Sequence, residues 1–116
     1  MTKKDTFVYL GYGTAYNCQF ATGRYGNGNL ALEIMGAEGT EYEGEPIVRV
    51  TVNPGCAVAD GHIAIKDYSE NEGMVEFCKK IGIIEGNPTQ VIPSGYVEIT
   101  VYKLTDSGKE LFSTEN

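Results

Sequence analysis

Short runs in which apolar residues take every second position recur along this chain, and most of them end at glycine, proline or asparagine. Segments 16–20 and 30–35 alternate in this way, so each would place its apolar side chains on one face of a strand. Between them lies segment 23–29, where Asn27-Gly28 supplies the positive φ angles of a tight hairpin turn. The pattern therefore predicts an antiparallel sheet made of consecutive hairpins.

Further short strands are expected at residues 7–10, 47–53, 62–66, 90–92 and 96–104. The predicted fold is α+β, with an antiparallel sheet of about five to seven short strands and one principal helix on one face. A chain of 116 residues has room for one domain, so residues 1–116 are expected to form it. Residues 1–5 and 105–116 are polar enough to be frayed or loosely docked.

One helix is predicted over about 71–81. Ser69 followed by Glu72 matches a capping box, Gly82 is placed to end the helix in a left-handed conformation, and Gly73 could delay its regular part to the next residue. An apolar stripe runs through it at helical spacing: Met74, Phe77, Cys78 and Ile81. We expect the stripe to pack against a sheet face made by Val48, Val50, Val52, Val97, Ile99 and Val101.

The chain is strongly acidic, with 16 acidic and nine basic residues and a net charge of −7. Residues 31–76 hold ten acids and two bases, a net of −8, which leaves +1 for the rest. Such a charge repels phosphate backbones and anionic lipid, so direct nucleic-acid binding and membrane binding are not expected. Two interpretations remain, a solvated face that keeps the protein soluble and a surface that binds a basic partner.

The cysteines and the N-terminal sequence point to a reducing compartment. Cys18, Cys56 and Cys78 are an odd number with no close spacing, which favours free thiols over a disulfide framework or a zinc site. No apolar run reaches the length of a membrane span, and the first residues lack the apolar stretch of a signal peptide. A cytoplasmic location is expected.

No catalytic, cofactor or metal site can be assembled from the motifs. His62 is the only histidine, and Asp60 is the only residue near it in sequence that could orient it as a base. The glycines of 23–28 precede a strand, whereas a phosphate loop precedes a helix, and Ser94 stands outside a nucleophile motif. We therefore expect a protein that is not an enzyme and has no cofactor.

Tyrosines interleaved with acids are common where proteins meet. Of the eight tyrosines, Tyr9, Tyr16 and Tyr102 are expected to pack in the sheet, and Tyr25, Tyr42 and Tyr68 are expected to be exposed. The candidate partner-binding residues are Glu38, Glu41, Tyr42, Glu43, Glu45, Asp67, Tyr68, Glu70, Glu72 and Glu76.

Four stretches carry a resemblance, in their order along the chain: 25–32 (YGNGNLAL), 44–46 leading into 50–53 (GEP, VTVN), 65–74 (IKDYSENEGM) and 93–96 (PSGY). The chain resembles, over most of residues 20–104, a small bacterial domain family of unknown function carried on conjugative elements and phages. Accessory genes of such elements often encode inhibitors of host defence, and the family supplies no catalytic residues to transfer.

Two classes of function therefore remain for this sequence. The first is a non-enzymatic interaction module that binds a protein with a basic surface, such as a restriction or CRISPR-type defence protein whose nucleic-acid groove it would fill. The second is a small-molecule binding domain or small enzyme, with a site near His62, Asp60, Asp67 and the tyrosines. A continuous anionic surface favours the first and a closed apolar pocket with convergent polar groups favours the second.

Overall fold

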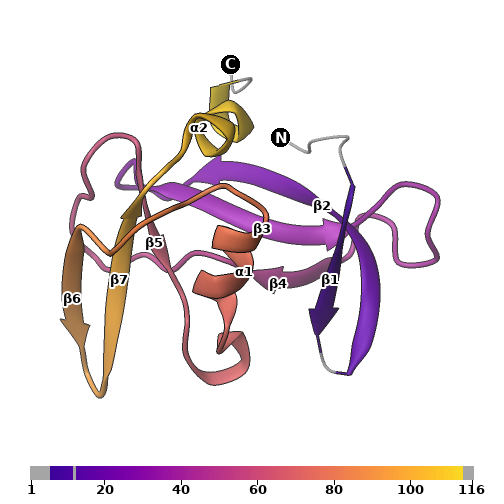
Figure 1. The fold of residues 1–116 in the computed structure, drawn as a ribbon, viewed down its shortest axis with the longest axis horizontal. Coiled ribbons are helices and arrows are strands. Elements are labelled where there is room, and N and C mark those ends of the chain that lie inside the picture. The colour runs from indigo at the N-terminus through magenta and orange to yellow at the C-terminus, as the bar shows by residue number, and fades with distance from the viewer. Residues whose placement is uncertain (1–5, 12, 114–116) are drawn as a thin grey trace.

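The computed structural model describes residues 6–11 and 13–113, and within them seven strands form two antiparallel sheets accompanied by two α-helices (Figure 1). The first sheet has the order β1-β2-β3-β4. Its strands are β1 (Phe7–Gly11), β2 (Thr14–Arg24), β3 (Leu30–Gly36) and β4 (Pro46–Arg49). The second sheet has the order β5-β7-β6, with strands β5 (His62–Ile65), β6 (Gln90–Ser94) and β7 (Val97–Lys103).

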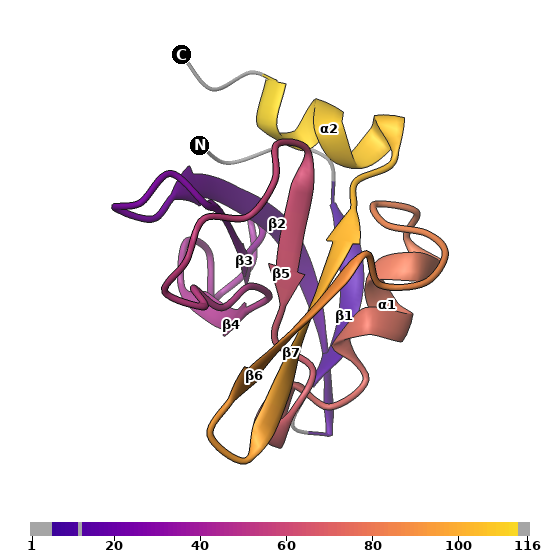
Figure 2. The same ribbon diagram turned by 90° about the vertical axis from the view of Figure 1, so that its left-hand side faces the viewer.

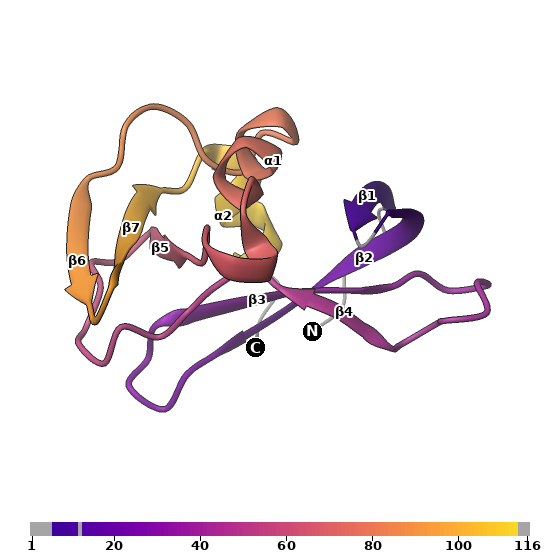
Figure 3. The same ribbon diagram turned by 90° about the horizontal axis from the view of Figure 1, so that it is seen from below.

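Residues 50–52, which follow β4, connect the two sheets through backbone hydrogen bonds. The Val50 N–H donates to the Leu32 carbonyl in β3 at 2.9 Å, and the Val52 N–H donates to the Ala64 carbonyl in β5 at 3.2 Å. Thr51 forms an antiparallel bridge with Ile65. The seven strands therefore continue as one curved layer, which Figures 2 and 3 show from the side and from below.

The helical segments are η1 (Ser69–Asn71), α1 (Met74–Lys80) and α2 (Asp106–Ser113). In Figures 1 and 3, α1 lies between β1 at one end of the curved layer and β7 toward the other. The helix predicted over 71–81 is thus confirmed in place but shorter, and Gly82 follows it with φ of +84°, as expected. The coarse α+β class is confirmed, although strands dominate and the sheet is divided in two.

The C-terminal segment was expected to be frayed or loosely docked, and for residues 106–113 this is wrong. They form α2, which buries Phe112 to 8% exposure. Gly108 allows the close approach, because a Cβ at this position would overlap the carbonyl oxygen of Ile83. The expectation for residues 1–5 and 114–116 lies outside the described residues.

The packing of α1 differs from the prediction. Val48 and Val50 do share a core with Met74 and Cys78, but Ile99 and Val101 belong to a second cluster with Ala64 on the opposite face of β7. The other buried side chains of the main core are Cys18, Phe20, Leu32, Ile34, Ile63, Ile65, Val75, Ile83, Ile84, Tyr102, Leu104 and Phe112. Because β7 is buried on both faces, alternation alone could not tell which face meets the helix.

The β2–β3 hairpin is confirmed, with a different turn from the one predicted. The Gly28 N–H donates to the Tyr25 carbonyl and the Tyr25 N–H donates to the Asn29 carbonyl, both at 2.9 Å. Only Gly28 has a positive φ, +90°, whereas Asn27 does not. This is the geometry of a turn that closes on a left-handed glycine, so one glycine was sufficient.

The capping box predicted at Ser69 and Glu72 is wrong. Ser69 begins the short η1 turn with φ of +55°, and its side chain makes no cap hydrogen bond to α1. Instead the Asp67 carboxylate accepts a hydrogen bond from the Val75 N–H at 3.1 Å, at the first turn of α1. A carboxylate there satisfies a free backbone donor and opposes the positive end of the helix dipole.

Replacing Asp67 with alanine is expected to lower the free energy of unfolding by about 1 kcal/mol, the usual value of a lost N-terminal cap. Asp67→Asn keeps an acceptor oxygen and serves as the matched control, with most of the stability retained. Ser69→Ala should change stability by less than about 0.5 kcal/mol. Urea denaturation measures the free energy of unfolding of all three variants. A larger loss of stability for Ser69→Ala than for Asp67→Ala would support the capping box instead.

Candidate functional site

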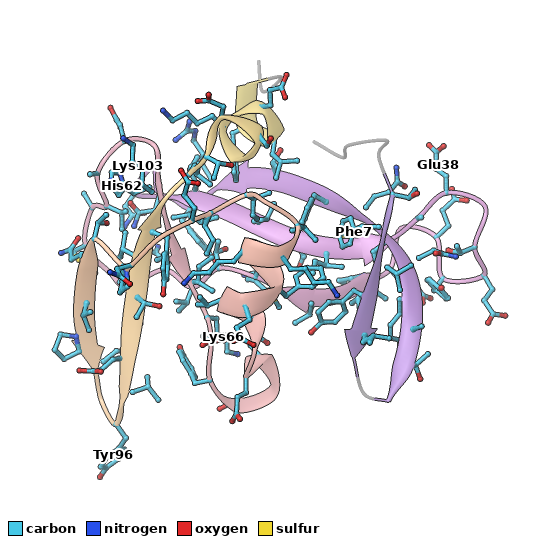
Figure 4. The ribbon with its side chains drawn as sticks, viewed as in Figure 1. Phe7, Glu38, His62, Lys66, Tyr96 and Lys103 are labelled. Carbon is cyan, nitrogen blue, oxygen red and sulfur yellow. The ribbon has the colours of Figure 1, made fainter. Side chains whose placement is uncertain are left out.

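The acidic loop, residues 37–45 between β3 and β4, carries four exposed glutamates: Glu38, Glu41, Glu43 and Glu45. It extends from the end of the first sheet, and Figure 4 shows Glu38 far from Tyr96 at the tip of the β6–β7 hairpin. Among the described residues, none of these four carboxylates is in an ion pair. The loop therefore presents uncompensated negative charge to solvent.

This loop has a defined conformation, because its backbone and one ring are bonded to the first sheet. The Gly36 N–H donates to the Glu45 carbonyl at 2.9 Å, and the Gly44 N–H donates to the Gly36 carbonyl at 3.1 Å. The Tyr42 hydroxyl accepts a hydrogen bond from the Asn17 N–H at 3.0 Å, and its ring meets Tyr16 edge to face with centroids 5.3 Å apart.

Within the loop, the Glu43 carboxylate accepts a hydrogen bond from the Gly39 N–H at 2.9 Å. The Thr40 hydroxyl donates to the Ala37 carbonyl at 2.7 Å. These bonds hold the turn that separates Glu38 from Glu41. The charges are consequently displayed in a fixed arrangement, which costs less conformational entropy on binding than a mobile loop would.

A second group of predicted residues lies around η1 and the start of α1: Asp67, Tyr68, Glu72 and Glu76, with the backbone of Glu70. Figures 1 and 3 show η1 and the acidic loop well apart. The basic side chains of Arg49 and Lys66 line a hollow of about 260 Å³ beside β4, where Arg49 pairs with Glu33 at 3.5 Å. The ten candidates thus form two groups.

The tyrosines expected to be exposed, Tyr25, Tyr42 and Tyr68, are in fact half-buried. The Tyr25 hydroxyl lies 3.1 Å from Thr51 Oγ1, and the Tyr68 ring is covered by Lys66, whose Nζ lies 5.7 Å from its centroid. Among the tyrosines that the structure describes, Tyr96 is the fully exposed one. Half-buried rings that hold loops in place explain these tyrosines better than ring contacts with a partner do.

The arrangement of His62 differs from the predicted pair of a base and an orienting Asp60 carboxylate. Its Nδ1 lies 2.9 Å from the backbone carbonyl of Asp60, so the carboxylate of Asp60 is not what orients the ring. His62 and Asp60 line an open pocket of about 340 Å³, and no tyrosine is among its lining residues. Asp67 lies elsewhere, beside α1. The structure therefore does not bring together the second predicted site.

The buried cysteines are unsuited to nucleophilic or ligand chemistry. Burial raises the pKa of the Cys78 thiol to about 12, and the negative charge of Asp67 contributes to the rise. Burial also raises the pKa of Cys18, against a smaller opposing effect of a backbone hydrogen bond from Tyr9. Among the described residues, no group of three or more histidines, cysteines or acids is placed to hold a metal ion.

Thiol labelling should distinguish these cysteines. At neutral pH a charged disulfide reagent is expected to modify the exposed Cys56 rapidly, and Cys18 and Cys78 only on unfolding, since the thiolate is the reactive form. Rapid labelling of all three cysteines in the native protein would contradict the buried placement of Cys18 and Cys78.

The pKa of Cys78 also makes stability depend on pH. The raised pKa of Cys78 favours the folded state below pH 9.0, the ordinary thiol value, and this contribution is lost as pH rises toward 12.

The acids of the loop were identifiable from composition, but the basic residues near His62 were not. Arg24, Lys109 and His62 come from three distant segments, and no motif links them.

No helix of the described residues is long and apolar enough to cross a membrane. Comparisons of the chain with protein-family models, with curated proteins and with solved structures found no match.

Proposed function

We propose that this protein is a non-enzymatic interaction module whose acidic loop binds a protein with a basic surface. The observation that supports this most is the loop itself, in which four exposed glutamates without ion pairs among the described residues stand on a backbone held by Tyr42 and Gly36. Fixed charges of one sign increase the rate of encounter with an oppositely charged surface and specify its orientation.

The partner class to test first follows from the sequence. The resemblance of residues 20–104 to a domain family carried on mobile elements points to a host defence protein as the target, and nucleic-acid-binding proteins have basic grooves. In this proposal the acidic loop fills such a groove, and the group around η1 contributes only if the partner surface reaches that far. Direct binding of nucleic acid by this chain is not part of the proposal.

Two charge-reversal variants of equal net charge test the role of the loop. Glu41→Lys with Glu45→Lys reverses the loop but leaves Glu43, which bonds the Gly39 N–H. Glu85→Lys with Glu98→Lys makes the same change from −7 to −3 at two exposed positions, one in the connection between α1 and β6 and one on β7. A bacterial-lysate pull-down with the parent protein identifies the binder, and its association rate is then measured at several salt concentrations.

The loop variant is expected to associate about tenfold more slowly at low salt, with little change in stability. The control pair should be affected far less, and His62→Ala should bind as the parent does. Nucleic acid should compete for the partner. Equal slowing by both pairs would show that the association rate depends on net charge alone and not on the loop. Simultaneous binding of nucleic acid and this protein to the partner would exclude binding in the partner's nucleic-acid groove.

A further inference from the structure

An open pocket of about 340 Å³ lies where the β2–β3 hairpin, the loop before β5 and α2 meet. Figure 4 shows His62 and Lys103 together at the end of the second sheet nearest α2. The volume falls in the range of sites for small molecules. This pocket lies apart from the acidic loop, so it is independent of the function proposed above.

Two cationic side chains line the pocket, Arg24 and Lys109. Arg24 is held by a hydrogen bond from its Nη1 to the Gly28 carbonyl at 2.9 Å. Lys109 extends from α2 along Gly61, where a Cβ would lie 3.6 Å from Lys109 Cε. The chain's only histidine, His62, donates through Nδ1 to the Asp60 carbonyl, so Nε2 of the neutral ring can only accept a hydrogen bond from a ligand.

The pocket lining also contains apolar side chains. Leu30, Val58, Leu104 and Phe112 contribute to its lining, and Leu104 and Phe112 belong to the main core. Core side chains change position little, so the part of the pocket that Leu104 and Phe112 form has a stable shape. A ligand with an apolar or aromatic body would lie against these side chains while its charged group faces Arg24 and Lys109.

The loop that borders the pocket is positioned by Asn29, whose side chain is 7% exposed. Its Nδ2 donates to the Cys56 carbonyl at 2.8 Å and to Asn53 Oδ1 at 3.1 Å, and its Oδ1 accepts from the Val58 N–H at 2.8 Å. Three hydrogen bonds from one buried amide hold the approach to β5. The pocket is therefore formed in advance of any ligand.

We propose that this pocket binds a small organic anion, a carboxylate or phosphate group on an apolar or aromatic body. Two cationic side chains beside apolar side chains of the main core match that chemistry, in a chain whose net charge is −7. Asp60, which also lines the pocket, opposes the anion and limits its affinity. The anion is therefore expected to lie toward Arg24 and Lys109.

Titration of the full-length protein with phenyl phosphate and with benzoate, followed by amide NMR shifts, tests this assignment. Saturable shifts are expected at Gly28, Gly61 and Lys109. Inorganic phosphate should bind more weakly because it lacks the apolar body, and benzyl alcohol more weakly because it lacks the charge. Arg24→Gln and Lys109→Gln should each raise the dissociation constant about tenfold, and Asp60→Asn should lower it.

Lys80→Gln, an exposed change on α1 outside the pocket, is the matched control and should leave the dissociation constant unchanged. Thermal melts establish that every variant is folded. Shifts that never saturate, equal weakening by Lys80→Gln, or no gain for Asp60→Asn would each overturn the assignment. Loss of protein-partner binding in the loop variants would leave it untouched, so the two proposals fail separately.

Discussion

Replacing Gly36 with alanine is expected to lower the free energy of unfolding by about 3 kcal/mol, near the upper end for overpacked positions. Gly36 ends β3, and a Cβ there would overlap the backbone carbonyl of Tyr42 in the acidic loop. Backbone cannot rotate away as a side chain can, so either the loop or the strand end must shift. Urea denaturation gives the change directly.

Gly23→Ala, in β2, is the matched control, because its Cβ would meet nothing within 4 Å and its φ is not positive. Little change in stability, or a small gain, is expected there. The Gly36 variant should also bind the partner more weakly, since the bonds that order the loop include both backbone groups of Gly36. A loss below 1 kcal/mol would mean that the loop does not pack against β3 as described.

Truncation of Phe77 to alanine is expected to cost about 3 kcal/mol, the lower part of the range for large core aromatics because this ring is half-buried. The ring packs against β1: its centroid lies 5.9 Å from that of Phe7 and 5.2 Å from that of Tyr9, edge to face with the latter. A loss below 1 kcal/mol would show that α1 is not docked at this position.

A double-mutant cycle identifies the surface that Phe77 contacts. Phe77→Leu combined with Phe7→Leu should show a coupling energy of about 0.5 to 1.5 kcal/mol, as paired rings do. Phe77→Leu combined with Val101→Ala should be additive, because Val101 lies in the second cluster. The reverse result would favour the valine face expected from the sequence.

The strands were predictable because their alternation is produced by burial on one face. Leu32 and Ile34 alternate with half-buried neighbours, and the structure buries both as expected. The same reasoning did not reach β7, where Val101 and Tyr102 are adjacent and both buried, on opposite faces. When both faces of a strand are buried, the alternation of apolar residues does not show which face meets a given neighbour.

The ends of helices depended on contacts that are remote in sequence. Asp67 caps α1 from eight residues away, where no local capping pattern applies. For α2, Leu111 and Phe112 were the only apolar signal in a polar segment, and its docking needs the absence of a side chain at Gly108. Such a fit depends on the carbonyl of Ile83, which only the tertiary structure places there.

Exposure of the acidic loop could be predicted from its glutamates, glycines and proline, but its order could not. The contacts that hold Tyr42 come from β2, where Asn17 and Tyr16 have no sequence relation to the loop. The pocket beside His62 was similarly hidden, because Arg24 and Lys109 are 85 positions apart. Charge composition predicts that a segment is exposed and acidic, whereas a pocket can be predicted only when the topology of the fold is known.

The junction at residues 50–52 bears on how the chain reaches its native state. The strands β1 to β4 pair with their neighbours in sequence, and the Thr51–Ile65 bridge needs only a short loop. In contrast β7 must insert between β5 and β6, so the second sheet is complete only when residue 103 has been made. Pairing between distant segments is slow. During synthesis the first sheet can therefore form early, while the edge of β5 that pairs with β7 stays open until β7 has been made.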